Sequence, residues 1–177
     1  RMQRDVMNGT SNIGAMVSGV LREKADDAFT AGMDYSLRWD SNRINWNGHW
    51  VGTRAPGPDG MKTSGGGVTN FSVSRKHLNF SSHYDHFGRD FRVNDLGFFR
   101  SRGNRNQVNG GLEVGNPDPW KQLRSIWGFS YWNNDWTDEK LLIGRYSEYG
   151  ANVRFMNFWQ VVGGGWRTFT VFDALDT

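Results

Sequence analysis

Three residues near the middle of the chain carry side chains that commonly bind metal ions. His83, Asp85 and His86 offer two imidazoles and one carboxylate within a short stretch. Residues 77–86 alternate in polarity, and in a β-strand His83 and Asp85 share one face while His86 points to the other. Two ligands on one face make a poor metal site. We therefore predict no metal here and interpret these side chains as polar lumen or loop residues.

Other stretches that resemble reactive motifs lack the residues that the chemistry requires. The glycine runs 65–67 and 163–165 have no Gly-Lys-Ser/Thr ending of a phosphate loop, and glycine inside a strand marks a bend or a bulky neighbour. Asp135, Asp138 and Glu139 lie together, but without EF-hand spacing. There is no Gly-x-Ser-x-Gly nucleophile elbow. We predict no catalytic residue and no cofactor, so an enzyme is the less favoured interpretation.

The composition is aromatic-rich and hydrophilic at the same time. The 177 residues include 23 Gly, 9 Trp and 12 Phe, yet the mean hydropathy is −0.68. Alternating strands produce this combination, because each apolar residue is matched by a polar one. No apolar run approaches the roughly 18–20 residues of a membrane helix. A net charge of +3 is too weak to indicate nucleic acid, and the lack of cysteine excludes disulfides and thiolate metal sites.

Residues 29–40 show the alternation most clearly, with Phe29, Met33 and Leu37 on one parity and Asp34 and Arg38 on the other. Similar patterns predict an all-β fold, an antiparallel up-and-down meander of about nine strands. The predicted strands are 11–23, 29–40, 44–54, 64–75, 77–86, 104–115, 121–132, 141–155 and 159–172.

The predicted connections alternate between short and long. Short segments (DSNR, RKH, NPDP, MNF) follow the even strands, and longer ones (KADDA, APGPDGMKT, FGRDFRVNDLGF, NNDWTDE) follow the odd strands. Transmembrane β-barrels have short periplasmic turns and longer outer loops, and their strands need about 9–11 residues. We therefore predict part of a transmembrane barrel whose apolar face contacts lipid. The residues expected to face its lumen are Asp34, Arg38, Asn109, Glu113 and Arg154.

The tryptophans support this interpretation, because most of them lie near the ends of predicted strands, where a barrel carries its interfacial aromatic girdles. They are Trp39, Trp46, Trp50, Trp120, Trp132, Trp136, Trp159 and Trp166.

The stretch 84–114 resembles a motif of DUF5916-type bacterial outer-membrane proteins, in which a carbohydrate-binding family 9-like domain precedes a C-terminal β-barrel region. In this motif an Asp-Phe pair is followed by a Leu/Met-Gly-Phe-hydrophobic-x-Arg element. Arg100 stands one position from the family's arginine, and residues 11–14 also resemble an early barrel strand. The resemblance implies an outer-membrane location but no catalytic site. The matching residues are Asp90, Phe91, Gly97, Phe98 and Arg100.

We expect residues 1–177 to be a single domain and an internal piece of a larger barrel, because bacterial single-chain barrels have even strand numbers and the ending FDALDT is not an aromatic-ended closing strand. The predicted role is structural, transport or envelope-associated, in the outer membrane of a Gram-negative bacterium. Expected partners are outer-membrane lipid and glycan or other envelope proteins, not nucleic acid. Two alternatives stay open: a soluble, tryptophan-rich carbohydrate-binding β-sandwich that uses Trp46 and Trp50, and a glycan hydrolase module.

Overall fold

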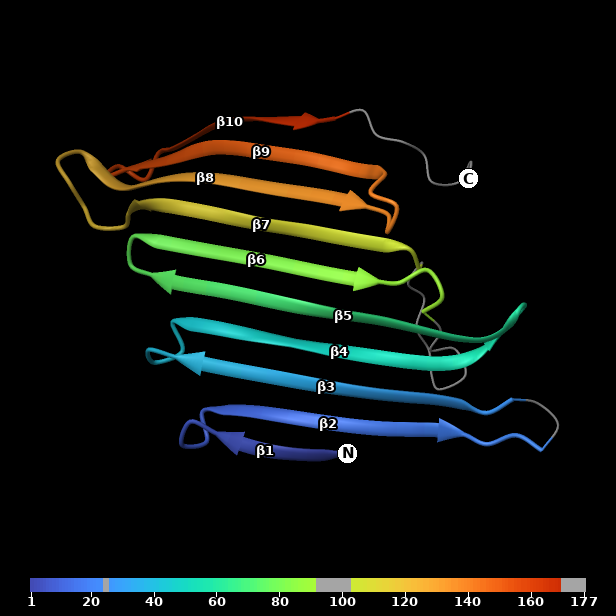
Figure 1. The fold of residues 1–177 in the computed structure, drawn as a ribbon. Helices are drawn as coiled ribbons and strands as arrows, with labels where there is room; N and C mark the ends of the chain where they lie inside the picture. The colour runs from blue at the N-terminus through green and yellow to red at the C-terminus, as the bar shows by residue number, and fades with distance from the viewer. Residues whose placement is uncertain (24–25, 92–102, 170–177) are drawn as a thin grey trace.

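The chain folds into one antiparallel β-sheet of ten strands in up-and-down order (Figure 1). The computed structural model describes residues 1–23, 26–91 and 103–169. Each strand pairs with its sequence neighbours, and the sheet is open because β1 and β10 do not pair with each other in these residues. The strands are β1 (Met2–Val6), β2 (Ser11–Val20), β3 (Ala28–Trp39), β4 (Ile44–Gly57), β5 (Gly60–Arg75), β6 (Leu78–Phe87), β7 (Arg105–Asn116), β8 (Leu123–Trp136), β9 (Leu142–Phe155) and β10 (Gln160–Thr168).

The predicted antiparallel meander is confirmed, but the predicted number of nine strands is wrong. The additional strand is β1, which pairs with β2 from Met2 opposite Ala15 to Val6 opposite Ser11. Its sequence MQRDV carries polar residues on both faces, so it has no apolar alternation to detect. The pair Asn8-Gly9, a strong hairpin signal, was the available clue.

The connections divide between the two ends of the sheet (Figure 1). The short-turn end carries 7–10, 40–43, 76–77, 117–122 and 156–159, and the opposite end carries 21–27, 58–59, 88–104 and 137–141. The expected short turn after β7 is wrong, because residues 117–122 separate β7 from β8, a longer connection than 137–141 at the opposite end. The expected long loop after β4 is also wrong, because β4 and β5 continue pairing until Gly57 meets Gly60. Pro58-Asp59-Gly60 makes a tight turn there, with Gly60 at a φ of 106° that disfavours other residues.

The two faces of the sheet follow from the register, since paired residues share a face and successive residues alternate. The face of Met33 continues through Ala15 on β2 and Trp50 on β4. We call it the apolar face. The face of Asp34 continues through Gly14 and His49, and we call it the polar face.

Few hydrophobic side chains are buried among the described residues, and they are Ala28, Ala55 and Phe87. Large apolar side chains are instead exposed along the apolar face, among them Val17 at 75%, Met33 at 50% and Tyr149 at 63%. Within the described ranges, no helix is long and apolar enough to cross a membrane. The sheet therefore presents one apolar surface that the described part of the chain leaves uncovered.

Candidate functional site: the polar face

The five residues predicted to face a lumen all lie on the polar face. Asp34 and Arg38 belong to β3, Asn109 and Glu113 to β7, and Arg154 to β9. Cross-strand partners share a face, so the register shows which residues lie together. Asn109 lies opposite His83, and Arg154 lies opposite Gln160. Whether this face lines a lumen stays a prediction, but the side chains do form one surface.

A row of amides and one imidazole crosses five neighbouring strands at the centre of this face. The members of this amide row are cross-strand partners in the order Asn47, Asn70, His83, Asn109 and Asn133. Asn70 Nδ2 donates to Asn47 Oδ1 at 3.1 Å, and His83 Nδ1 lies 2.6 Å from Asn70 Oδ1. Gln107 joins from the next row, because its Nε2 donates to Asn133 Oδ1 at 2.7 Å. The row can therefore both donate and accept hydrogen bonds.

A second row, beside the first, carries carboxylates. Asp34, Asp85 and Asp135 occupy the same register row, which also contains His49 and Gln107. Each carboxylate has a cationic or imidazole neighbour: Arg1 at 3.4 Å, His83 at 3.3 Å and Arg105 at 3.6 Å, respectively. One oxygen each of Asp85 and Asp135 is buried without a hydrogen-bond partner among the described residues. The row therefore places carboxylates beside basic groups across the polar face.

Three aromatic rings of β8 that were not predicted as site residues also belong to the polar face. Trp127, Phe129 and Tyr131 lie opposite Gly115, Gly150 and Gly111, respectively. A Cβ built on these glycines would approach the rings to 2.7, 2.6 and 2.5 Å, so each ring lies across the neighbouring strand. The signal was available, since Trp127, Phe129 and Tyr131 share one parity while Gly128 and Ser130 share the other.

The opposite face carries an apolar band that runs obliquely across the strands. On β4 the first charged residue beyond the band is Arg54, and on β9 it is Arg145. Arg145 shares a register row with Gly48 of β4, so the edge of the band shifts by six residues between β4 and β9.

The other edge of the band shifts by six residues between β3 and β9. Trp39 of β3 shares a register row with Tyr149 of β9, whereas the apolar residues of β9 continue six residues further, to Phe155. For the first edge, between β4 and β9, six residues span about 20 Å and the five strand spacings span about 24 Å. The strands therefore cross the band at about 40° from its normal.

Trp46 and Trp50, the proposed sugar-stacking residues of the sandwich alternative, lie on the apolar face. Trp46 packs edge-on against Tyr35 with ring centroids 5.2 Å apart, and its Nε1 donates to Thr69 Oγ1 at 2.8 Å. Trp50 lies against Tyr84, whose ring also stacks on Trp136 with centroids 6.4 Å apart. In this aromatic series Tyr84 and Trp136 lie at the edge of the apolar band at the end opposite the short turns, whereas Trp50 lies four residues before Arg54, inside the band.

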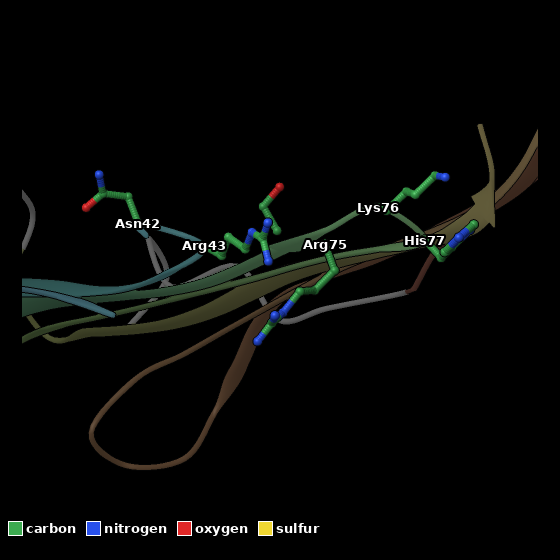
Figure 2. Close-up of a pocket in the computed structure, with 6 residues that line it drawn as sticks. Asn42, Arg43, Arg75, Lys76 and His77 are labelled. Atoms are coloured by element: carbon green, nitrogen blue, oxygen red, sulfur yellow. The ribbon is translucent and has the colours of Figure 1, made fainter. Parts of the chain in front are cut away.

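A shallow hollow lies between the turns 40–43 and 76–77. Figure 2 shows Arg43, Arg75, Lys76 and His77 along these turns, with the Arg75 and Lys76 side chains pointing in different directions. Arg75 pairs with Asp40 and Lys76 with Asp118, each at 2.5 Å. Because these ion pairs offset two of its cations, the hollow is a weak candidate for binding an anion.

The acidic residues near the end of β8 are held by protein donors. Asn106 Nδ2 donates to Asp138 Oδ1 at 2.9 Å, Asn104 Nδ2 donates to Glu139 Oε2 at 3.0 Å, and Arg89 pairs with Glu139. His86 lies on the apolar face, with its Nδ1 2.8 Å from Asn106 Oδ1. In the described part of the chain, no group of three or more His, Asp or Glu side chains is placed to hold a metal ion.

Comparison of the chain with protein-family models, with curated proteins and with solved structures found no match. The resemblance to DUF5916-type proteins therefore stays a prediction. Of its motif residues, Asp90 and Phe91 follow β6, and the Phe91 ring lies 5.7 Å from that of Phe87. Gly97, Phe98 and Arg100 lie outside the described residues.

Proposed function

We propose that this chain forms part of the wall of a β-barrel in the outer membrane of a Gram-negative bacterium. The apolar face contacts lipid and the polar face lines a lumen with a transport or envelope-associated role. The observation that carries the proposal is the oblique apolar band. Strands of outer-membrane barrels tilt by about 35–45°, so a horizontal lipid layer meets them as an oblique stripe. The angle of about 40° derived from the register agrees with this tilt.

The aromatic series at one edge of the band supports the same orientation. Tyr84 and Trp136 lie where the face changes from apolar to polar, since His86 follows Tyr84 on the same face and Asn106 is the cross-strand partner of Trp136. Trp and Tyr concentrate at membrane–water boundaries because they join an apolar ring to a polar group. In this arrangement the short turns lie on the periplasmic side and the β4–β5 hairpin projects outward.

Under this proposal, the two open edges of the sheet need partner strands. Among the described residues, β1 and β10 each pair on one side only. Unpaired backbone groups are not tolerated in lipid, so both edges must pair with further strands. The lumen is therefore completed by strands beyond this sheet.

Cysteine substitution tests the two faces directly, because the chain contains no cysteine. Leu112→Cys and Glu113→Cys are adjacent on β7 and lie on opposite faces. In intact cells we expect a water-soluble maleimide to label position 113 and to leave position 112 unlabelled until the membrane is dissolved. Asp59→Cys, in the β4–β5 turn, is the positive control for labelling. Equal labelling of 112 and 113 in intact cells would contradict the proposal.

A further inference from the structure

We propose that the polar face carries a binding track for an uncharged oligosaccharide, formed by Trp127, Phe129 and Tyr131 of β8 and by the polar side chains beside them. This inference rests on the proposed function, because it needs a polar face that opens on water. It specifies the class of ligand and the strand along which that ligand binds.

The orientation of the three rings is the first support. Each ring lies over a glycine of the neighbouring strand, as the approach distances of 2.5 to 2.7 Å for a built Cβ require. The covered side of each ring is in contact with backbone, so the other side faces the space in front of the sheet. Phe129 and Tyr131 have centroids 5.5 Å apart and planes inclined by 35°. Tyr131 is exposed and Trp127 and Phe129 are half-buried, so the three rings present aromatic surface along β8 on the polar face.

Polar groups are placed on both sides of this row. Glu113, opposite Phe129, accepts hydrogen bonds from Tyr131 Oη and from Asn79 Nδ2. Glu148, opposite Tyr131, accepts from Tyr146 Oη at 2.7 Å. Asn152 lies opposite Trp127. Each ring is thus bordered by a carboxylate or an amide that is fixed by the sheet.

This combination suits a sugar chain better than other polymers. A pyranose has an apolar C–H face that packs on an aromatic ring, and a rim of hydroxyls that bond to carboxylates and amides. Arg105 and Arg154 lie at the two ends of the polar face of β7–β9, while Glu113 and Glu148 lie beside the rings. Negative charge along the track disfavours nucleic acid and acidic glycans. The complementary ligand is therefore a neutral oligosaccharide.

Calorimetry with the purified, detergent-solubilised protein tests the binding track by measuring the affinity for two oligosaccharides. We expect maltohexaose, which is neutral, to bind, and hexagalacturonate, which is anionic, not to bind. Phe129→Leu and Tyr131→Leu keep apolar volume over the glycines and remove the ring, so each should weaken maltohexaose binding about three- to tenfold. Phe80→Leu, which removes a ring from the apolar face, should leave the affinity unchanged.

A double substitution tests the role of charge separately. Glu113→Gln with Glu148→Gln keeps one accepting oxygen at each position and removes two negative charges, so hexagalacturonate should then bind. The proposal is overturned if the unsubstituted protein binds neither sugar or prefers hexagalacturonate, or if the β8 variants bind maltohexaose as Phe80→Leu does. These failures are distinct from failure of the proposed function, which the labelling of positions 112 and 113 decides independently.

Discussion

Glycines in this sheet stand directly opposite large side chains. Gly48 faces Tyr35, Gly67 faces Trp50 and Gly110 faces Trp132 in the register. Where the partner is an aromatic ring, the missing Cβ lets the ring lie against the neighbouring backbone. This explains at the residue scale how a chain with 23 glycines forms long strands, although glycine weakens strand interiors.

Gly48→Ala is expected to destabilise the sheet, because its Cβ would lie 2.3 Å from the carbonyl oxygen of Val68 and 2.8 Å from Tyr35 Oη. We expect the free energy of unfolding to fall by about 1–3 kcal/mol. Gly52→Ala, on the same strand and face, is the matched control, since its nearest atom would be 3.9 Å away. Urea unfolding in detergent, followed by tryptophan fluorescence, measures both. Equal stability of the two variants would show that Gly48 has no steric role.

Charge reversal on the polar face should change ion selectivity. Asp34→Lys and Glu113→Lys each replace a carboxylate of the proposed lumen by an ammonium group, so selectivity should move towards anions. Reversal potentials across a planar bilayer measure this in the intact protein. Asp59→Lys in the β4–β5 turn changes the net charge equally and should have a smaller effect. An unchanged reversal potential in both lumen variants would argue against a conducting role.

At the element scale, alternation predicted most strands because a strand such as β3 has one apolar and one polar face. It could not predict β1, whose residues are polar on both faces, because its place is fixed by hydrogen bonding to β2. It also ended β4 too early, because Pro56 and Gly57 are typical of loops, whereas both pair with residues of β5.

Part of the candidate site could also be predicted from the sequence. The parity of Asp34, Arg38, Asn109, Glu113 and Arg154 placed them together on the polar face. The amide row depends instead on the register between strands, since Asn47, Asn70 and Asn133 are distant in sequence and meet only as cross-strand partners. A single sequence without the register does not contain this information.

Two arginine substitutions on β5 test where the apolar band ends. Phe71 lies within the band and Thr63 lies beyond it, and both are exposed on the apolar face. Phe71→Arg should cost about 2–4 kcal/mol if that position is deep in lipid, while Thr63→Arg should cost about 0–1 kcal/mol. Unfolding in lipid vesicles measures the difference. Similar costs at both positions would remove the evidence for a lipid boundary along β5.

At the scale of the whole molecule, the sheet is organised by its exposed surface rather than by a buried core. Ala28, Ala55 and Phe87 are the buried hydrophobic residues of the described part of the chain, whereas the apolar face is broadly exposed. Exposed apolar surface of this extent marks an interaction with lipid or with another protein. We assign this interaction to lipid because the band crosses the strands at an angle close to the strand tilt of outer-membrane barrels.

The most direct test is extraction of the native protein from washed cell envelopes with and without detergent, followed by gel electrophoresis of boiled and unboiled samples. We expect the protein to leave the membrane only with detergent and boiling to change its mobility, because a barrel stays folded in the unheated sample. Release in plain buffer, with the same mobility before and after boiling, would contradict the membrane location. It would favour the alternative of a soluble carbohydrate-binding β-sandwich.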